Sequence, residues 1–272
     1  MLITAQKARD LSIQLTKSQV LLNYVKEVEQ VSSVIEAGRI RKNKGSILQE
    51  DVCYEMRFMD EDDLKDMMAL EEIIVQNLSD KEIFRTHASD YFKDHFKVEN
   101  SVIGIFSDDG LIAYNVLYFP GVEGDNFGTD IDLPSDELDK VVHLETVAVH
   151  PAFRGNSLQR KMEGVHLRTI QEMGYNHVCC MVSPKNRSSL QNIFSNGLII
   201  KALKIKFGWR LRYIMHKNLL HPSAIGPEEI RINGFNIEGQ VDLLQKGFLG
   251  FQMTELADGF EISYGKDYAV TT

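Results

Sequence analysis

The chain has 272 residues, a formal net charge of −9 from 30 Lys and Arg against 39 Asp and Glu, and 43% hydrophobic residues. Such a chain can bury a large core, which excludes disorder as its dominant state. The acidic balance argues against a nucleic-acid partner, and we expect no membrane partner because no apolar run approaches about 20 residues. The first residues lack a signal-peptide pattern, and three cysteines make neither a disulfide framework nor a metal-site spacing. We therefore expect a cytoplasmic protein without a metal.

Residues 1–45 combine a helical pattern with a basic stretch. Apolar side chains recur at three- and four-residue steps as far as Ile35, which indicates amphipathic helices. Residues 39–45, RIRKNKG, then predict an exposed linker. The pattern leaves two roles open for this N-terminal helical extension: packing on the main body, or docking and homo-oligomer formation.

From residue 52 onward, strand and helix patterns alternate. Strands are predicted over 52–59, 101–106, 111–119, 141–149, 177–182, 199–207 and 210–217. Helices are predicted over 60–78, 80–96, 155–173 and 187–195. Residues 221–272 add further strand-like and helical stretches as a C-terminal extension. This order predicts an α/β (α+β) protein whose sheet is covered on both faces.

Residues 141–168 carry the strongest chemical signal. Residues 141–149 form a nearly continuous apolar run, typical of a buried central strand, and residues 154–159, RGNSLQ, open the next helix. The first N–H groups of a helix lack intrahelical partners, and the helix dipole favours an anion there. Between residues 154 and 168, four Arg and Lys oppose only Glu163. A polyphosphate ligand fits this reversal of charge, although a plain strand–turn–helix with a solvated basic face has the same pattern.

Three blocks of the chain resemble the GNAT superfamily of acetyl-CoA-dependent N-acetyltransferases. Residues 147–159, VAVHPAFRGNSLQ, are similar to its strand end and Arg-Gly turn, with Ser157 and Gln159 where the family has small residues. Residues 183–190, SPKNRSSL, and 196–198, NGL, resemble its later Asn-Ser-Leu segment, and 57–64, RFMDEDDL, its first strand and helix start. The resemblance covers roughly residues 52–220. It implies a GNAT-like mixed, mostly antiparallel central sheet flanked by helices, with both terminal extensions outside it.

The resemblance also implies acetyl-CoA as acyl donor, lying in a gap between the strands at 141–149 and 177–182. The pantetheine arm would bond along Val147, Ala148 and Val149. The residues expected at the pyrophosphate are Arg154, Gly155, Asn156, Ser157, Leu158, Gln159 and Arg160. Asn186 and Ser189 of the later block complete the expected cofactor site.

The implied reaction moves the acetyl group directly to a primary amine, so a base is needed. Glu145 is the candidate, because a carboxylate within an apolar strand is costly unless it is paired or used. His143 lies on the same face, about 7 Å along the strand, and could tune Glu145, act as the base or be structural. The Tyr that many relatives carry seven residues after Asn186 is Ile193 here. Ser183, Asn186 or a water could instead protonate the CoA thiolate.

The acceptor is suggested only by the loop at 120–140. Its carboxylates are Glu123, Asp125, Asp130, Asp132, Asp136, Glu137 and Asp139. They could form an acidic wall that attracts a cationic small amine or a protein amine, or simply a solvated loop. The alternative function is a catalytically silent GNAT-like module that binds acyl-CoA or scaffolds a partner.

Overall fold

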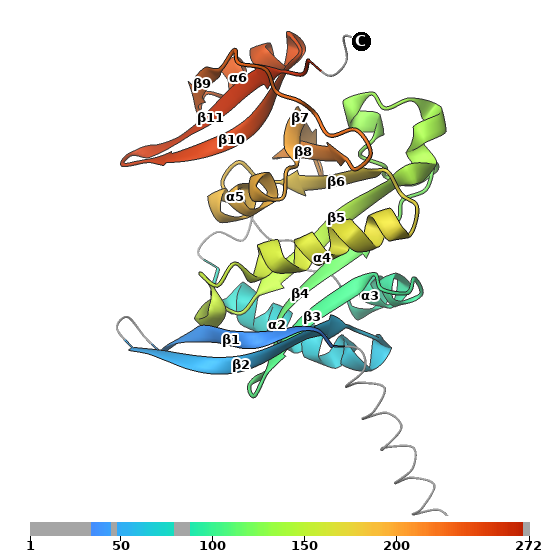
Figure 1. The fold of residues 1–272 in the computed structure, drawn as a ribbon, viewed down its shortest axis with the longest axis vertical. Helices are drawn as coiled ribbons and strands as arrows, with labels where there is room; N and C mark the ends of the chain where they lie inside the picture. Colours follow the sequence, from blue (N-terminus) through green and yellow to red (C-terminus); the bar gives the residue numbers. More distant parts are fainter. Residues whose placement is uncertain (1–33, 45–47, 79–87, 269–272) are drawn as a thin grey trace, which may run out of the picture.

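The computed structural model describes residues 34–44, 48–78 and 88–268. These residues form an 11-stranded sheet in the order β1-β2-β3-β4-β5-β6-β8-β7-β10-β11-β9 (Figure 1). Its strands are β1 Val34–Lys44, β2 Leu48–Phe58, β3 Val102–Ser107, β4 Gly110–Tyr118, β5 Val141–Val149, β6 His177–Val182, β7 Ile199–Lys206, β8 Arg210–Asn218, β9 Ile230–Asn233, β10 Phe248–Leu256 and β11 Gly259–Lys266. Among these strands only β5 and β6 pair in parallel, so the predicted mixed, mostly antiparallel sheet is confirmed.

Helices cover both faces of the sheet. They are α2 Leu64–Gln76, α3 Ser89–Phe96, α4 Leu158–Glu172, α5 Arg187–Ser195 and α6 Ile237–Gln245, with 3-10 turns η1 Glu61–Asp63, η3 Thr129–Ile131, η4 Ser135–Lys140 and η5 Pro151–Phe153. One apolar cluster packs α2 and α3 on β3 and β4, and others pack α4 and α5 on the opposite face. No helix within the described ranges is long and apolar enough to cross a membrane.

The strand β1 corrects the predicted boundary of the N-terminal extension. Residues 34–44 were expected to end a helix and form a linker, but they pair antiparallel with β2, from Val34 opposite Arg57 to Lys44 opposite Leu48. The basic residues fit an edge strand, where charged side chains reach solvent while the backbone pairs on one side. Ile40 is buried between them and joins a core cluster. The helices predicted over residues 1–33 lie outside the described residues.

The C-terminal extension is α/β and continues the main sheet. Gly250 of β10 pairs with Ile200 of β7, and β11 and β9 follow beyond it. A side chain at Gly250 would meet Ile200 at about 3.0 Å, so the close pairing favours glycine there. The amide of Gln240 in α6 accepts hydrogen bonds from two buried tyrosine hydroxyls, one of β8 and one of β11. The extension is thus tied to the body by backbone and side chains.

The sheet opens where β5 and β6 diverge. Their parallel register runs only from Val141 opposite His177 to His143 opposite Cys179, although β5 continues to Val149 and β6 to Val182. The connections from these strands lead to the N-termini of α4 and α5, which therefore lie at the same opening (Figure 1). Ligands commonly bind at the carboxyl ends of parallel strands, beside such helix N-termini.

Candidate active site

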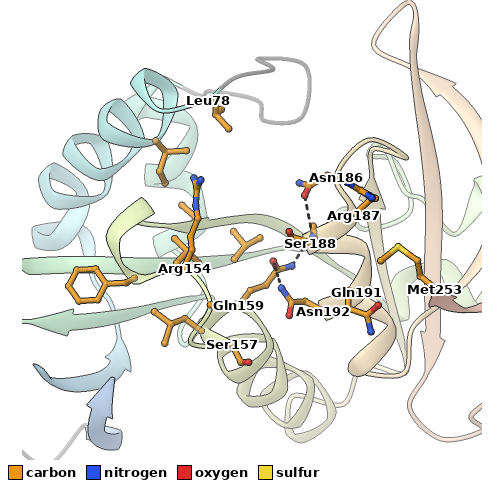
Figure 2. Close-up of a pocket in the computed structure, with 18 of the residues that line it drawn as sticks. Leu78, Arg154, Ser157, Gln159, Asn186, Arg187, Ser188, Gln191, Asn192 and Met253 are labelled. Atoms are coloured by element: carbon orange, nitrogen blue, oxygen red, sulfur yellow. Dashed lines mark hydrogen bonds between the residues drawn. The ribbon is translucent and has the colours of Figure 1, made fainter. Parts of the chain in front are cut away.

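A cavity of about 580 Å³ occupies the opening between β5, α4 and α5 (Figure 2). The predicted cofactor residues that line it are Val147, Ala148, Val149, Arg154, Gly155, Ser157, Leu158, Gln159, Asn186 and Ser189. Asn156 and Arg160 are outside this lining. Ile74 and Leu78 near the end of α2, and Met253 and Glu255 of β10, line the cavity without having been predicted. Only tertiary packing brings α2 and β10 here, so no local pattern could have identified them.

The turn before α4 lines the cavity through Arg154, Gly155 and Ser157. Gly155 has a φ of 86°, a conformation that favours glycine, and Ser157 at the N-cap has a φ of 57°. A non-glycine residue in this left-handed region is strained, and such strain clusters at ligand sites. The N-cap side chain makes no capping hydrogen bond, so it does not satisfy the first N–H groups of α4. Left-handed residues in a turn and an uncapped helix make an anion-binding concavity.

Asn156 anchors this turn to β1 instead of lining the cavity. Its Oδ1 accepts from the Arg41 backbone N–H at 3.0 Å, and its Nδ2 donates to the Arg41 carbonyl at 2.7 Å. The side-chain amide therefore pairs with the free edge of β1 as another strand would. Nδ2 also lies 2.9 Å from the Phe153 carbonyl, which closes the turn on itself.

Gln159 is directed away from the turn and joins α4 to α5. Its Nε2 lies 2.7 Å from Glu163 Oε1 and 3.1 Å from Ser189 Oγ. Its Oε1 accepts from Asn192 at 3.1 Å (Figure 2). Asn196 donates to the other carboxylate oxygen of Glu163 at 2.8 Å. We call these five residues the α4–α5 polar cluster. It holds the side chain of Gln159 between α4 and α5, which form two walls of the cavity.

Glu163 is the only ionisable member of the α4–α5 polar cluster. It is almost completely buried, and burial raises its pKa to about 7. The hydrogen bonds from Gln159 and Asn196 favour the carboxylate but do not offset the loss of hydration.

Asn186 and Ser183 have different places in the structure. Asn186 lines the cavity and caps α5, where its Oδ1 accepts from the Ser189 N–H at 3.2 Å. Ser183 is buried at the end of β6, and its Oγ accepts from the Lys185 N–H at 3.3 Å. It lines a second cavity rather than the first. Ile193, at the position of the family's Tyr, is buried in the core and offers no hydroxyl.

Glu145 lies at an irregularity in β5. Val116 of β4 is opposite Thr146 while Leu117 is opposite Leu144, so Glu145 is the extra residue of a bulge. A bulge re-aims a side chain out of the regular alternation. The half-buried carboxylate accepts a hydrogen bond from the Tyr91 hydroxyl of α3 at 2.7 Å. Sequence patterns gave no reason to single out Tyr91.

His143 lies on the same side of the sheet as Glu145 but is closed off from solvent. A series of ring contacts runs from Tyr91 through His95 and Tyr118 to His143. His143 is fully buried, stacks on Phe127 at 3.9 Å between centroids, and accepts at Nε2 from the Phe127 N–H at 3.1 Å. Burial lowers its pKa to about 3. The geometry favours the structural role among the three considered for His143.

The acidic loop is partly neutralised by its neighbours. Lys206 of β7 lies 2.6 Å from Asp130 and 3.4 Å from Asp125. Glu137 lies 3.2 Å from the His177 ring and 3.4 Å from Lys140. The acidic wall expected from the other carboxylates of this loop stays a prediction.

The adjacent cysteines and the acidic side chains suggest no further chemistry. Cys179 and Cys180 are buried in clusters on opposite faces of the sheet, and burial raises the pKa of both thiols. Neither is therefore suited to accept an acyl group. Within the ranges that the structure describes, no three His, Cys, Asp or Glu side chains gather as a metal site requires.

No protein-family model and no curated protein sequence matches the chain. Its structure is similar to that of yncA, a putative acetyltransferase from Salmonella typhimurium solved with acetyl-CoA, at 19% identity and a TM-score of 0.47, over 61% of this chain and 94% of that chain. It is also similar to a GNAT-family acetyltransferase from Listeria monocytogenes, at 16% identity and a TM-score of 0.46, over 65% and 99% of the two chains. The ribosomal-protein-S5-alanine acetyltransferase from Vibrio fischeri is similar at 12% identity and a TM-score of 0.46, over 63% and 96%.

Proposed function

We propose that the chain is a GNAT-type N-acyltransferase that moves an acetyl group from the CoA thioester directly to a primary amine. One observation carries the proposal. Ten of the twelve residues whose motif predicts coenzyme A binding, although split between two segments about thirty residues apart, line one cavity at the opening of β5 and β6. The cavity volume is in the usual range for a cofactor or small-molecule site.

The first step is binding of the acyl donor. The diphosphate sits on the N–H groups of the turn at residues 154–160, where the left-handed Gly155 and the uncapped helix provide donors and Arg154 adds a positive charge. The pantetheine arm pairs with the backbone of Val147 and Val149, which lies beyond the last β5–β6 register pair. Isothermal titration of acetyl-CoA into the full chain tests this step.

The second step is nucleophilic attack by the neutral amine. Glu145 accepts a proton from the acceptor ammonium, directly or through water, and the hydroxyl of Tyr91 holds one carboxylate oxygen so that the other remains to take the proton. The amine nitrogen bonds to the thioester carbonyl carbon, the C–S bond breaks, and the thiolate leaves with its electron pair. The nitrogen gives up its second proton to that thiolate, directly or through water, so that a neutral amide and the CoA thiol result. A water, Ser183 or the amide of Asn186 assists that departure. Backbone N–H groups at the open edge of β5 stabilise the transient oxyanion.

Thiol release from acetyl-CoA, measured with a panel of primary amines, tests the reaction. Wild type is expected to turn over with at least one amine, and Glu145→Gln to lose rate while binding acetyl-CoA as before. A chain that binds acetyl-CoA but releases no thiol with any amine is instead the silent acyl-CoA-binding module. Ile193 favours that second function, because its buried alkyl side chain replaces the family's hydroxyl donor.

The remaining partner hypothesis concerns the N-terminus. Homo-oligomer formation through the predicted helices stays a prediction, since residues 1–33 lie outside the described part of the chain. Deleting them and measuring mass in solution tests it. An unchanged mass would contradict the hypothesis.

A further inference from the structure

A second cavity, of about 340 Å³, lies where the C-terminal extension meets the main body. Its walls are the loop between β6 and α5, the turn that leads into β8, and the segment just before α6. We call it the hairpin cavity, after the β7–β8 hairpin that contributes Trp209 and Arg210. Its size is suitable for a small molecule.

The hairpin cavity is lined by several cationic side chains, in a chain of formal net charge −9. Among its lining residues that the structure describes, Lys185, Arg210 and Arg212 are cationic and none is acidic. Arg212 is buried and donates from Nη1 to the Leu211 carbonyl at 2.9 Å, which fixes its guanidinium in the wall. A planar guanidinium is matched geometrically to a carboxylate. The positive charge and the planar shape of the guanidinium therefore favour a ligand that carries a carboxylate.

The same cavity exposes aromatic surface. Trp209 is 62% exposed and Phe235 is 68% exposed, and both line the cavity. The Arg210 guanidinium lies 5.6 Å from the centroid of the Trp209 ring, so the cation and the ring are already stacked. Large exposed aromatic rings beside a fixed cation provide a surface for an apolar group attached to an anion.

One tight turn separates the hairpin cavity from the cavity at the opening of β5 and β6, which we call the coenzyme A cavity. Ser183 lines the hairpin cavity and Asn186 the other, and the Asn186 N–H donates to the Ser183 carbonyl at 2.9 Å. The β5–β6 register ends at His143 opposite Cys179, and β6 continues to Val182, directly before Ser183. A ligand in the hairpin cavity thus lies one turn away from a residue that lines the cavity in which we place pantetheine.

We propose that the hairpin cavity binds the acceptor of the transfer and that this acceptor is an apolar α-amino acid. Its carboxylate lies on Arg210 and Arg212, its side chain packs on Trp209 and Phe235, and its amine is directed past Ser183 to the thioester. The inference rests on the acetyl transfer proposed above, which supplies the need for an amine. It replaces the cationic acceptor expected from the acidic loop.

Trp209 is the only tryptophan of the chain, so its fluorescence emission can report ligand binding at the hairpin cavity. Phenylalanine and its product analogue N-acetylphenylalanine are titrated into the full chain, with excitation at the red edge of the tryptophan band. A saturable change in emission is expected, and phenethylamine, which lacks the carboxylate, should bind at least about tenfold more weakly. Trp209→Phe abolishes the signal, and calorimetry then shows whether binding remains.

Arg210→Gln is the decisive variant. It should raise the dissociation constant for N-acetylphenylalanine and the KM for phenylalanine by about tenfold, because one charge-assisted hydrogen bond is lost. The affinity for acetyl-CoA should not change. Lys204→Gln, which removes an exposed cation of the same hairpin outside both cavity linings, is the matched control and should change neither constant.

The outcomes separate this inference from the function on which it rests. Turnover with a diamine but none with phenylalanine would overturn the inference and leave acetyl transfer standing. If neither phenylalanine nor N-acetylphenylalanine changes the Trp209 emission, the inference is wrong whatever acetyl-CoA does. Absence of acetyl-CoA binding and of thiol release with every amine would refute the proposed function, and with it the acceptor role.

Discussion

The two cavities offer different hydrogen-bond donors to the anions that we propose they bind. In the coenzyme A cavity, the expected donors are backbone N–H groups of one continuous segment, fixed by the φ of Gly155 and the start of α4. In the hairpin cavity, they are guanidinium and ammonium groups from segments far apart in the chain, near residues 185, 210 and 212. Backbone donors respond to changes in chain geometry, whereas side-chain donors can be removed one at a time. This difference decides which substitutions disturb each cavity.

The largest expected effect concerns catalysis at the bulge of β5. Glu145→Gln should lower kcat by about 10²- to 10⁴-fold, the usual contribution of a general base, with acetyl-CoA affinity unchanged. Thiol release and calorimetry measure the two quantities. Tyr91→Phe is the matched variant, because it removes one hydrogen bond to Glu145 but keeps the carboxylate, and should cost only about fivefold. Full activity in Glu145→Gln would rule out this base.

The next effect is a pH dependence of stability from the α4–α5 polar cluster. Because the pKa of Glu163 is raised from 4.5 to about 7, the folded chain holds this proton more tightly than the unfolded chain. Its contribution to the free energy of unfolding is therefore present below pH 4.5 and is lost as the pH rises to about 7, by about 3 kcal/mol. Glu163→Gln removes this dependence.

The measurement must be a difference between variant and wild type. The buried His143, His166 and His216 have lowered pKa values, so they make stability rise with pH over part of the same range. In denaturant unfolding at several pH values, the free energy of unfolding of Glu163→Gln should rise relative to that of wild type between pH 4.5 and 7. Glu172→Gln changes a residue at the exposed end of the same helix. Its free energy of unfolding should depend on pH in the same way as that of wild type. Parallel curves for Glu163→Gln would show that Glu163 ionises normally.

Backbone geometry at the turn before α4 gives the third effect. Gly155→Val places a β-branched residue at a φ of 86°, which costs about 1–3 kcal/mol and should weaken acetyl-CoA binding about ten- to hundredfold as the turn relaxes. Gly164→Ala is the control, since a Cβ at either glycine meets nothing within 4 Å and only the backbone conformation differs. Calorimetry should show wild-type affinity for Gly164→Ala. Equal affinities for both variants would exclude the turn as the diphosphate site.

The smallest effect tests the attachment of that turn to β1. Asn156→Ala removes the paired hydrogen bonds with the Arg41 backbone and should lower the free energy of unfolding by about 1–2 kcal/mol. Acetyl-CoA affinity should fall only a few-fold, because Asn156 holds the turn against β1 but does not itself line the cavity. Asn43→Ala removes a longer bond of 3.4 Å to the Arg154 carbonyl and an exposed bond of 3.2 Å from Gln49, and should change both quantities less. An unaffected Asn156→Ala would show that β1 does not hold the turn.

Prediction from sequence was most accurate where burial and local chain chemistry agree. The strand Val141–Val149, the strand His177–Val182 and the helix Arg187–Ser195 have the bounds expected from their apolar patterns and turns. Prediction was wrong at residues 34–44, where alternation around the buried Ile40 was mistaken for a helix end and a linker. The error had a consequence, because the backbone of β1 is the partner of Asn156. The contact of Glu145 with Tyr91 was also out of reach, since it depends on a bulge and on a helix that is distant in sequence.

The amino-acid sequence by itself determined the order of strands and helices between about residues 52 and 220, and the glycine-containing turn before α4. These features arise from apolar periodicity and from residues such as Gly155, which act over a few neighbours. Only the tertiary structure decided that β5 and β6 part after His143, that Gln159 turns to α5, and that Trp209, Arg210 and Phe235 meet at one cavity. Those arrangements depend on which segments far apart in the sequence pack together. The free energy of that packing comes from the whole hydrophobic core and not from any local stretch of sequence.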